Sequence, residues 1–139
     1  MKILCKYLIF VFFVIIALIS CKKKNTDDAA YNAAIAKLVG KWNFVNSVTN
    51  QYHTNADHIT TVPGSSGDHM DFTSNGRVNL SLFSNRDTSK YTLIGDRKLV
   101  FDDVDNFDLK TLTATELVLY RKIVYSASAY KEETYNLKK

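Results

Sequence analysis

Two Asp-His pairs are the residues of this sequence whose types and spacing come nearest to a metal site. Asp57 precedes His58, and Asp68 precedes His69 in the same polar stretch of the chain. A carboxylate that orients an imidazole is a common feature of metal centres, and Asp71 offers one further oxygen ligand. Histidines in a polar stretch are more often surface residues than ligands, so the sequence predicts no metal site. Metal-assisted hydrolysis by His58 and His69 is the weakest function considered.

Two other stretches approach catalytic or cation-binding motifs, and both fall short of them. The stretch PGSSGD is one residue short of the G-x-S-x-G nucleophile motif and lacks its strand-turn-helix context, which indicates a turn. The stretch DDVDNFD lacks the central glycine and final glutamate of a calcium loop, so a solvated turn is favoured over a weak cation site. The sequence also contains no glycine-rich loop that could cradle a phosphate. We therefore predict no catalytic residue, no cofactor and no enzymatic activity.

A cysteine, Cys21, ends the apolar run at the start of the chain. The run follows Lys2 and Lys6 and is shorter than the roughly 20 apolar residues of a spanning helix, which favours a signal peptide. The stretch LISC that ends at Cys21 resembles the bacterial lipobox. This resemblance implies that the Cys21 thiol takes a diacylglycerol, that a peptidase cuts before it, and that the new amino terminus is acylated. A plain cleavable signal with a chance cysteine and an uncleaved membrane helix are the alternatives.

The lipobox resemblance divides the chain into three parts. Residues 1–20 would be the signal peptide, residues 21–30 the lipidated cysteine with a polar tether, and residues 31–139 the folded domain. Two or more acyl chains anchor a protein stably, so the membrane is the first expected partner. We expect the protein in the bacterial cell envelope, lipid-anchored at the outer membrane, facing either the periplasm or the surface.

The charge of the chain argues against nucleic-acid binding. The formal net charge is +4, but five of the 18 Lys and Arg residues precede Asn25. The rest of the chain then holds 13 basic residues against 14 acidic ones. A nucleic-acid interface needs a clustered basic surface, so we expect no nucleic-acid partner.

The periodicity of the domain predicts one short helix followed by strands. Asp27 or Asp28 could cap a helix that ends at Gly40, with Tyr31, Ile35 and Leu38 on one face. Asn75-Gly76 and Gly95-Asp96 are expected turns between strands that each have one apolar face. The expected strands are 42–48, 69–73, 77–83, 90–94, 97–102, 107–112, 116–124 and 132–139, with a weaker one at 58–62.

Eight or nine consecutive strands of this kind predict an all-β, up-and-down antiparallel β-barrel preceded by the helix. Antiparallel strands with one buried face form meanders, and closure removes the two bare edges of a meander. About eight strands close around side chains alone or around one small ligand. A β-sandwich of the immunoglobulin type is the alternative, although the cysteine and tryptophan spacing that would support it is absent.

The stretch Gly40-Lys41-Trp42, just after the helix and at the start of the first strand, resembles the hallmark motif of lipocalins. The whole domain resembles the lipocalin-like domains of small bacterial lipoproteins. It shares four motifs with them: L-x-G-x-W from Leu38 to Trp42, F-x-x-x-G from Phe72 to Gly76, Y-x-L at Tyr91, and L-T-x-x-x-L-x-L from Leu112 to Leu119. The long polar stretch Thr49–Asp68 has no counterpart among these motifs and is expected to be a loop.

The resemblance implies a barrel that Trp42 closes at its narrow end, with a basic residue across the tryptophan ring. Arg121 shares strand parity with Leu117 and Leu119, so it should point inward and stack on Trp42. The barrel-closing motif would then be Gly40, Trp42 and Arg121. The residues expected to line a ligand cavity are Phe44, Met70, Phe72, Leu80, Tyr91, Leu93, Phe101 and Leu119.

Lipocalins bind small, mostly apolar molecules, so the resemblance implies a binder of a small hydrophobic or amphipathic ligand at the envelope. The alternative is an interaction protein with a filled barrel, which would bind a protein partner through its loops, chiefly Thr49–Asp68. Cavity lining and core use the same residue types, so interior volume must separate the two hypotheses.

Overall fold

The computed structural model describes residues 26–54 and 56–139, and the predicted signal peptide and Cys21 lie outside the described residues. Within the described part, no helix is both long and apolar enough to span a membrane. This part consists of one helix and nine strands. Their bounds are α2 (Thr26–Leu38), β1 (Gly40–His53), β2 (Ala56–Pro63), β3 (His69–Phe72), β4 (Arg77–Leu82), β5 (Asn85–Ile94), β6 (Lys98–Phe101), β7 (Asp105–Leu112), β8 (Glu116–Ser126) and β9 (Ala129–Lys138).

The strands form a closed antiparallel barrel, because the first strand pairs with the last. Strands β3 to β9 follow one another around the sheet in chain order. Strand β1 joins β3 on one edge through Gly40–Asn43 and joins β9 on the other edge through residues 43–53. Eight strands thus close with no open edge between β1 and β9. The predicted all-β, up-and-down barrel preceded by a helix is confirmed.

The ninth strand, β2, lies outside the barrel and forms a hairpin with the second half of β1. One edge of β1 has two partners in succession: Gly40–Asn43 pair with β3, and Asn46–His53 pair with β2. The ladder between β1 and β9 bulges between Phe44 and Asn46, where the partner changes. Gly64 follows β2 at this point, and a Cβ there would overlap the carbonyl oxygen of Phe44. Only glycine therefore fits where the hairpin returns to the barrel.

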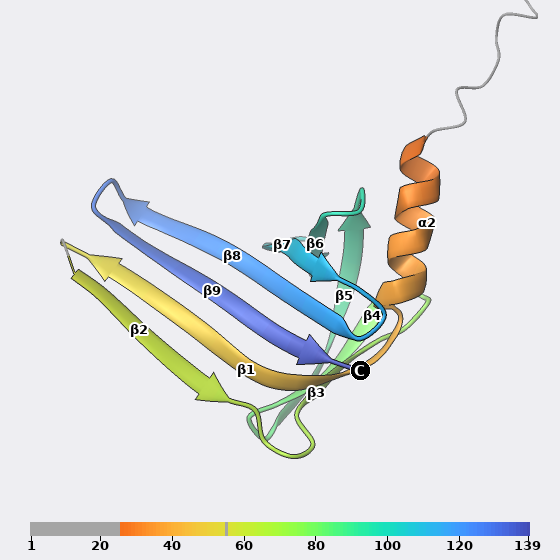
Figure 1. Ribbon diagram of the computed structural model, residues 1–139, viewed down its shortest axis with the longest axis horizontal. Coiled ribbons are helices and arrows are strands. Elements are labelled where there is room, and N and C mark those ends of the chain that lie inside the picture. The colour runs from red at the N-terminus through yellow and green to blue at the C-terminus, as the bar shows by residue number, and fades with distance from the viewer. Residues whose placement is uncertain (1–25, 55) are drawn as a thin grey trace, which may run out of the picture.

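Four strands continue past the barrel in the order β2-β1-β9-β8, and we call this part the projecting sheet. Strand β8 pairs with β7 only up to Tyr120, and from Arg121 to Ser126 it pairs with β9 alone. Figure 1 shows these four strands sweeping away from the shorter strands β3 to β7. Every residue of β2 is exposed.

The weaker strand predicted at 58–62 is confirmed as part of β2, whereas the loop expected for the whole of Thr49–Asp68 is wrong, because most of this stretch is a hairpin. Thr49 pairs with Thr60, and Asn50 pairs with Ile59. Four consecutive β-branched residues in β2 favour an extended backbone even though no face of the strand is buried. A strand exposed on both faces shows no apolar alternation, so its residue types rather than its periodicity indicate it. Gly64–Asp68 forms a turn after β2, as PGSSGD predicts.

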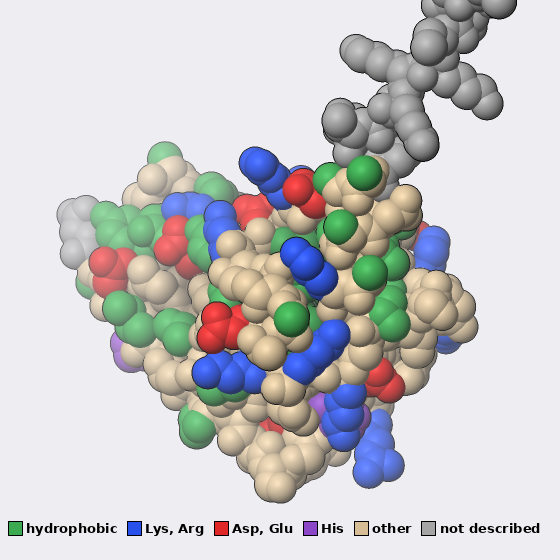
Figure 2. All heavy atoms as spheres, turned by 45° about the vertical axis from the view of Figure 1, so that its right-hand side comes forward, with side chains coloured by type: hydrophobic (Ala, Val, Ile, Leu, Met, Phe, Trp, Pro, Cys, Tyr) green, Lys and Arg blue, Asp and Glu red, His purple; other side chains and the backbone are tan. Residues whose placement is uncertain are grey.

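The interior contains the apolar residues that the alternating pattern predicts. The fully buried side chains are Leu38, Trp42, Phe72, Val78, Leu99, Leu117, Leu119 and Leu137. Helix α2 covers one end of the barrel with Ala34, Ile35 and Leu38, while Tyr31 is exposed rather than on the buried face. On the face shown in Figure 2, basic and acidic side chains are interspersed among polar ones.

Trp42 closes the end of the barrel beneath α2. Its indole N–H donates to the carbonyl oxygen of Leu38 at 2.7 Å, and the side chain is fully buried. The chain enters β1 through Gly40, whose φ of 118° a side chain would disfavour. Trp42 thus lies inside the end of the barrel that α2 covers, and Gly40 lies at the entry to β1.

The cation over the Trp42 ring is Lys139, which corrects the prediction for Arg121. The ammonium of Lys139 lies 4.5 Å from the ring centroid and donates to the carbonyl oxygens of Lys37 and Val39 at 2.8 and 2.9 Å. It thus also caps the carboxyl end of α2, where a positive charge is favourable. Arg121 points inward as expected, but toward the opposite end of the barrel.

Replacing Lys139 should loosen the closed end of the barrel. We expect Lys139→Met to lower the free energy of unfolding by about 1 kcal/mol, because a cation–π contact and a helix cap are lost together. Chemical denaturation followed by Trp42 emission measures this change. Lys138→Met is the matched control, because the Lys138 side chain is exposed and forms a long ion pair, with 3.9 Å between its Nζ and the Oε1 of Glu116. Equal effects of the two substitutions would contradict this role of Lys139.

Candidate functional site

A cavity of about 320 Å³ lies in the barrel at the end where β5 and β7 begin, opposite the end that α2 covers. We call this end the mouth. Its lining consists of Met70, Leu80, Leu82, Asp87, Ser89, Phe101, Asp102, Asp105, Phe107, Leu119, Arg121 and Tyr135. Seven of these twelve residues are apolar or aromatic, and four are charged. This combination is typical of small-molecule sites.

Four of the eight predicted lining residues line this cavity: Met70, Leu80, Phe101 and Leu119. The other four, Phe44, Phe72, Tyr91 and Leu93, are buried in the core and do not line it. Phe72 packs edge-on against Tyr91 with centroids 5.2 Å apart, so the closed half of the barrel is filled by side chains. Strand parity places all eight inside but does not tell which half of the barrel each one occupies.

Three aromatic rings form one wall of the cavity. Phe107 packs edge-on against Phe101 at 5.4 Å and against Tyr135 at 5.7 Å between centroids. Burial raises the pKa of the Tyr135 hydroxyl, so this group stays protonated at neutral pH. Phe107, Leu82 and Tyr135 were not among the predicted lining residues, although each has the inward strand parity that could have identified it.

Arg121 anchors a group of charges on the β8–β9 side of the mouth. Its Nη1 donates to Asp105 at 2.6 Å, and its Nε donates to Glu133. The guanidinium lies over the ring of Phe107, 4.8 Å from the centroid. Lys131 forms the second ion pair of Glu133, at 2.6 Å. The positive charge of Arg121 is therefore balanced by two carboxylates of the protein itself.

Glu133 is the buried member of this group. Only 6% of the residue is exposed, and Arg121 and Lys131 each pair with one of its carboxylate oxygens. Burial raises the pKa of the Glu133 carboxyl, but hydrogen bonds from Lys131 and Arg121 outweigh burial and hold that pKa below its ordinary value. Glu133 is therefore ionised at neutral pH and fixes the orientation of Arg121.

Two further aspartates, Asp87 and Asp102, stand at the rim of the cavity. Asp102 accepts from the backbone N–H of Lys90 at 2.8 Å, and Asp87 accepts from that of Thr88 at 2.7 Å. The hydrogen bonds from Lys90 and Ser89 hold the pKa of Asp102 below its usual value. Both side chains are thus held in place at the rim as negative charges.

Asp68 ties the turn after β2 to the mouth. Its carboxylate accepts from the backbone N–H of Ser65 at 2.8 Å and from that of Phe83 at 3.0 Å. Phe83 packs edge-on against Phe44 with centroids 5.4 Å apart. Asp68 therefore accepts hydrogen bonds from the backbone of two turns. It does not orient the imidazole of His69, whose Nδ1 donates to the carbonyl oxygen of Gly67.

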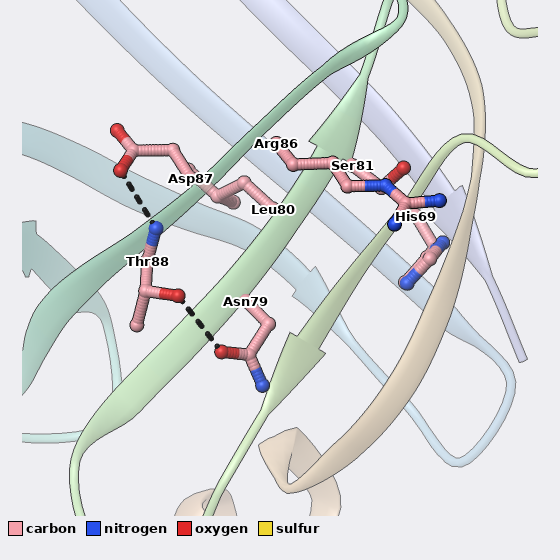
Figure 3. Close-up of a pocket in the computed structure, with 7 residues that line it drawn as sticks. All are labelled: His69, Asn79, Leu80, Ser81, Arg86, Asp87 and Thr88. Atoms are coloured by element: carbon pink, nitrogen blue, oxygen red, sulfur yellow. Dashed lines mark hydrogen bonds between the residues drawn. The ribbon is translucent and has the colours of Figure 1, made fainter.

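A second depression of about 700 Å³ lies on the outer surface of β3, β4 and β5 (Figure 3). Figure 3 shows polar side chains along it, with Thr88 donating to Asn79 at 3.1 Å. It contains His69, whereas His58 lies in a separate depression of about 350 Å³ at the tip of the projecting sheet. The structure thus does not bring His58 and His69 together. Within the described residues, no group of three or more potential metal ligands occurs.

The interior cavity is the best candidate site because it is set into the barrel and has a mainly apolar wall. Comparisons with family models, with curated proteins and with solved structures found no match to this chain. The eight-stranded antiparallel barrel is consistent with a lipocalin-like fold.

The low pKa of Glu133 predicts a specific pH dependence of stability. A carboxyl whose pKa is lowered on folding stabilises the fold fully above its ordinary pKa of about 4.3. That contribution is lost as the pH falls through the lowered pKa of the folded state. We expect Glu133→Gln to reduce the free energy of unfolding by about 1.5–3 kcal/mol at pH 7 and to flatten its decline in acid.

Denaturation midpoints between pH 2 and pH 7 measure this dependence. Glu116→Gln is the matched control, because the Glu116 side chain is exposed and its ion pair is long, with 3.9 Å between Oε1 and the Nζ of Lys138. It should lose less stability than Glu133→Gln and keep the acid profile of the natural chain. A Glu133→Gln profile parallel to that of the natural chain would contradict the assignment.

Proposed function

We propose that this protein is a lipid-anchored lipoprotein of the bacterial envelope whose barrel binds a small hydrophobic or amphipathic molecule. The mainly apolar cavity at the mouth supports this proposal most strongly. Ligand sites typically have volumes of roughly 300–1,000 Å³. A cavity of about 320 Å³ lies at the lower end of that range and suits a small ligand. The role is binding rather than catalysis.

The architecture supports entry of a ligand at the mouth alone. The other end is occupied by Trp42, Leu38 and the side chain of Lys139. At the mouth, Arg121 and the aspartates stand around an apolar interior. An amphipathic molecule could place its apolar part against Met70 and Leu119 and leave its polar part among the charges.

Protein binding through the projecting sheet is the second candidate function. Strand β2 is fully exposed and has no partner on its outer edge among the described strands. Unpaired strand edges accept an additional strand from another protein. In this alternative the hairpin of β1 and β2, rather than a loop, would contact the partner.

Filling the cavity should abolish ligand binding without unfolding the barrel. N-Phenyl-1-naphthylamine is a neutral apolar dye that fluoresces on entering apolar sites, and we expect saturable binding to the full chain. Leu80→Trp places bulk in the cavity lining and should weaken dye binding at least tenfold, about 1.4 kcal/mol. Ile94→Trp on the exposed face of β5 is the control and should leave binding unchanged. Equal dye binding by all three chains would reject the cavity as the site.

The lipid anchor predicts different outcomes for the two cysteines. Cells that express the chain and take up an alkyne-bearing fatty acid should label the natural protein. Cys21→Ser should remove the label and leave residues 1–20 attached, because the cleavage requires the lipidated thiol. Cys5→Ser is the matched control and should be labelled and cleaved normally. Label retained in the Cys21→Ser chain would overturn the anchor at that residue.

A further inference from the structure

The residues that line the mouth carry more negative charges than positive ones. Asp87, Asp102 and Asp105 line the cavity, and Arg121 is the one basic residue in its lining. Behind them, Glu133 and Lys131 form an ion pair and cancel in charge. The mouth thus carries a formal charge of about −2 at neutral pH.

The positive charges of the mouth are already neutralised by the protein. Arg121 pairs with both Asp105 and Glu133. A carboxylate or phosphate on a ligand would have to compete with these two groups for the guanidinium. The buried Glu133 holds Arg121 in this position, so the guanidinium is not free to turn toward an anion.

The negative charges at the rim, in contrast, have no directly bound cation in the described part of the chain, although the positive charges of Arg77 and Lys90 act on Asp102 from a distance. Within the described residues, neither Asp87 nor Asp102 forms an ion pair with a lysine or arginine. Their carboxylates accept hydrogen bonds from neighbouring backbone N–H groups, which orient them. Apolar walls strengthen the field of such charges at the opening of a cavity.

Aromatic rings that line the same cavity also favour a cationic ligand. Phe101 and Tyr135 line the same cavity, and the face of Phe107 already holds a cation, the guanidinium of Arg121, at 4.8 Å. Aromatic faces combined with carboxylates are the groups that recognise ammonium ions. A carboxylate of a ligand would gain nothing from either group.

We infer that the ligand is a cationic amphiphile, with an ammonium group at the rim near Asp87 and Asp102 and an apolar body in the cavity. This inference rests on the proposed function, since it names the class of molecule that the same cavity binds. Selection follows from repulsion as well as attraction: an anionic amphiphile of equal length meets two unpaired carboxylates on entry.

Displacement of the naphthylamine dye by three ten-carbon probes tests this inference. Decylammonium, decanol and decanoate have the same apolar chain and differ in the charge of the polar end. The full chain is used in a non-ionic detergent. The part of the dye fluorescence that is lost in the Leu80→Trp chain is taken as the cavity-specific signal. We expect decylammonium to displace this signal at a concentration at least tenfold lower than decanoate, with decanol between them.

Removal of the rim charges should remove the preference. The double substitution Asp87→Asn and Asp102→Asn should bring decylammonium and decanoate to within about threefold of each other, with decanol unchanged. Asp96→Asn, at the β5–β6 turn on the closed end of the barrel, removes one carboxylate away from the rim and should keep the full preference. If the double variant does not fold, Asp87→Asn alone must reduce the preference by about threefold.

The outcomes separate this inference from the proposed function. Equal or tighter binding of decanoate to the natural chain would overturn the charge selection and leave the cavity as a ligand site. A preference that survives in the Asp87→Asn, Asp102→Asn chain would also overturn it. Absence of any cavity-specific dye signal would instead reject the proposed function, and the inference with it.

Discussion

The backbone pairing of β1 is the constraint on which the rest of the structure depends. This strand hydrogen-bonds to β9 along one edge, and its other edge is shared between β3 and β2. Pairing of its first residues with β3 and β9 closes the barrel. Pairing of its later residues with β2 makes the projecting sheet, and the bulge at Phe44 marks the change. The mouth opens where these two regions meet, so the cavity and the hairpin are consequences of the same strand.

The two ends of the barrel use different chemistry. At the closed end, Trp42, Leu38 and the interior leucines exclude water, and the ammonium of Lys139 lies over the indole. At the mouth, Glu133 is buried because Arg121 and Lys131 satisfy both of its oxygens. A buried carboxylate without such partners would be strongly unfavourable. The closed end is therefore filled by apolar side chains, and the mouth is polar and partly open because the charged residues Glu133, Arg121 and Lys131 lie there.

Alternation of apolar and polar residues was sufficient to predict the strands of the barrel, because a closed sheet buries one face of every strand, and helical spacing predicted the helix. The sequence indicated β2 only weakly, at 58–62, and did not predict its hairpin with the second half of β1, since exposed strands show no such alternation. Strand parity placed Arg121 inward correctly, whereas the lipocalin resemblance assigned it to the wrong end. The position of Lys139 could have been inferred, because antiparallel pairing of the first and last strands brings the end of β9 beside the start of β1. Which lining residues leave a cavity depends on their volumes and rotamers together, which a one-dimensional pattern does not contain.

We propose that the barrel is not completely filled and carries a small molecule. Native mass spectrometry of the full chain, purified from its own membrane in a mild detergent, tests this most directly. We expect an added mass of a few hundred daltons beyond the covalent lipid, retained through desalting and lost when the protein is denatured. A protein that shows only its covalent mass, across several preparations, would contradict ligand binding and favour a filled barrel that acts through the projecting sheet.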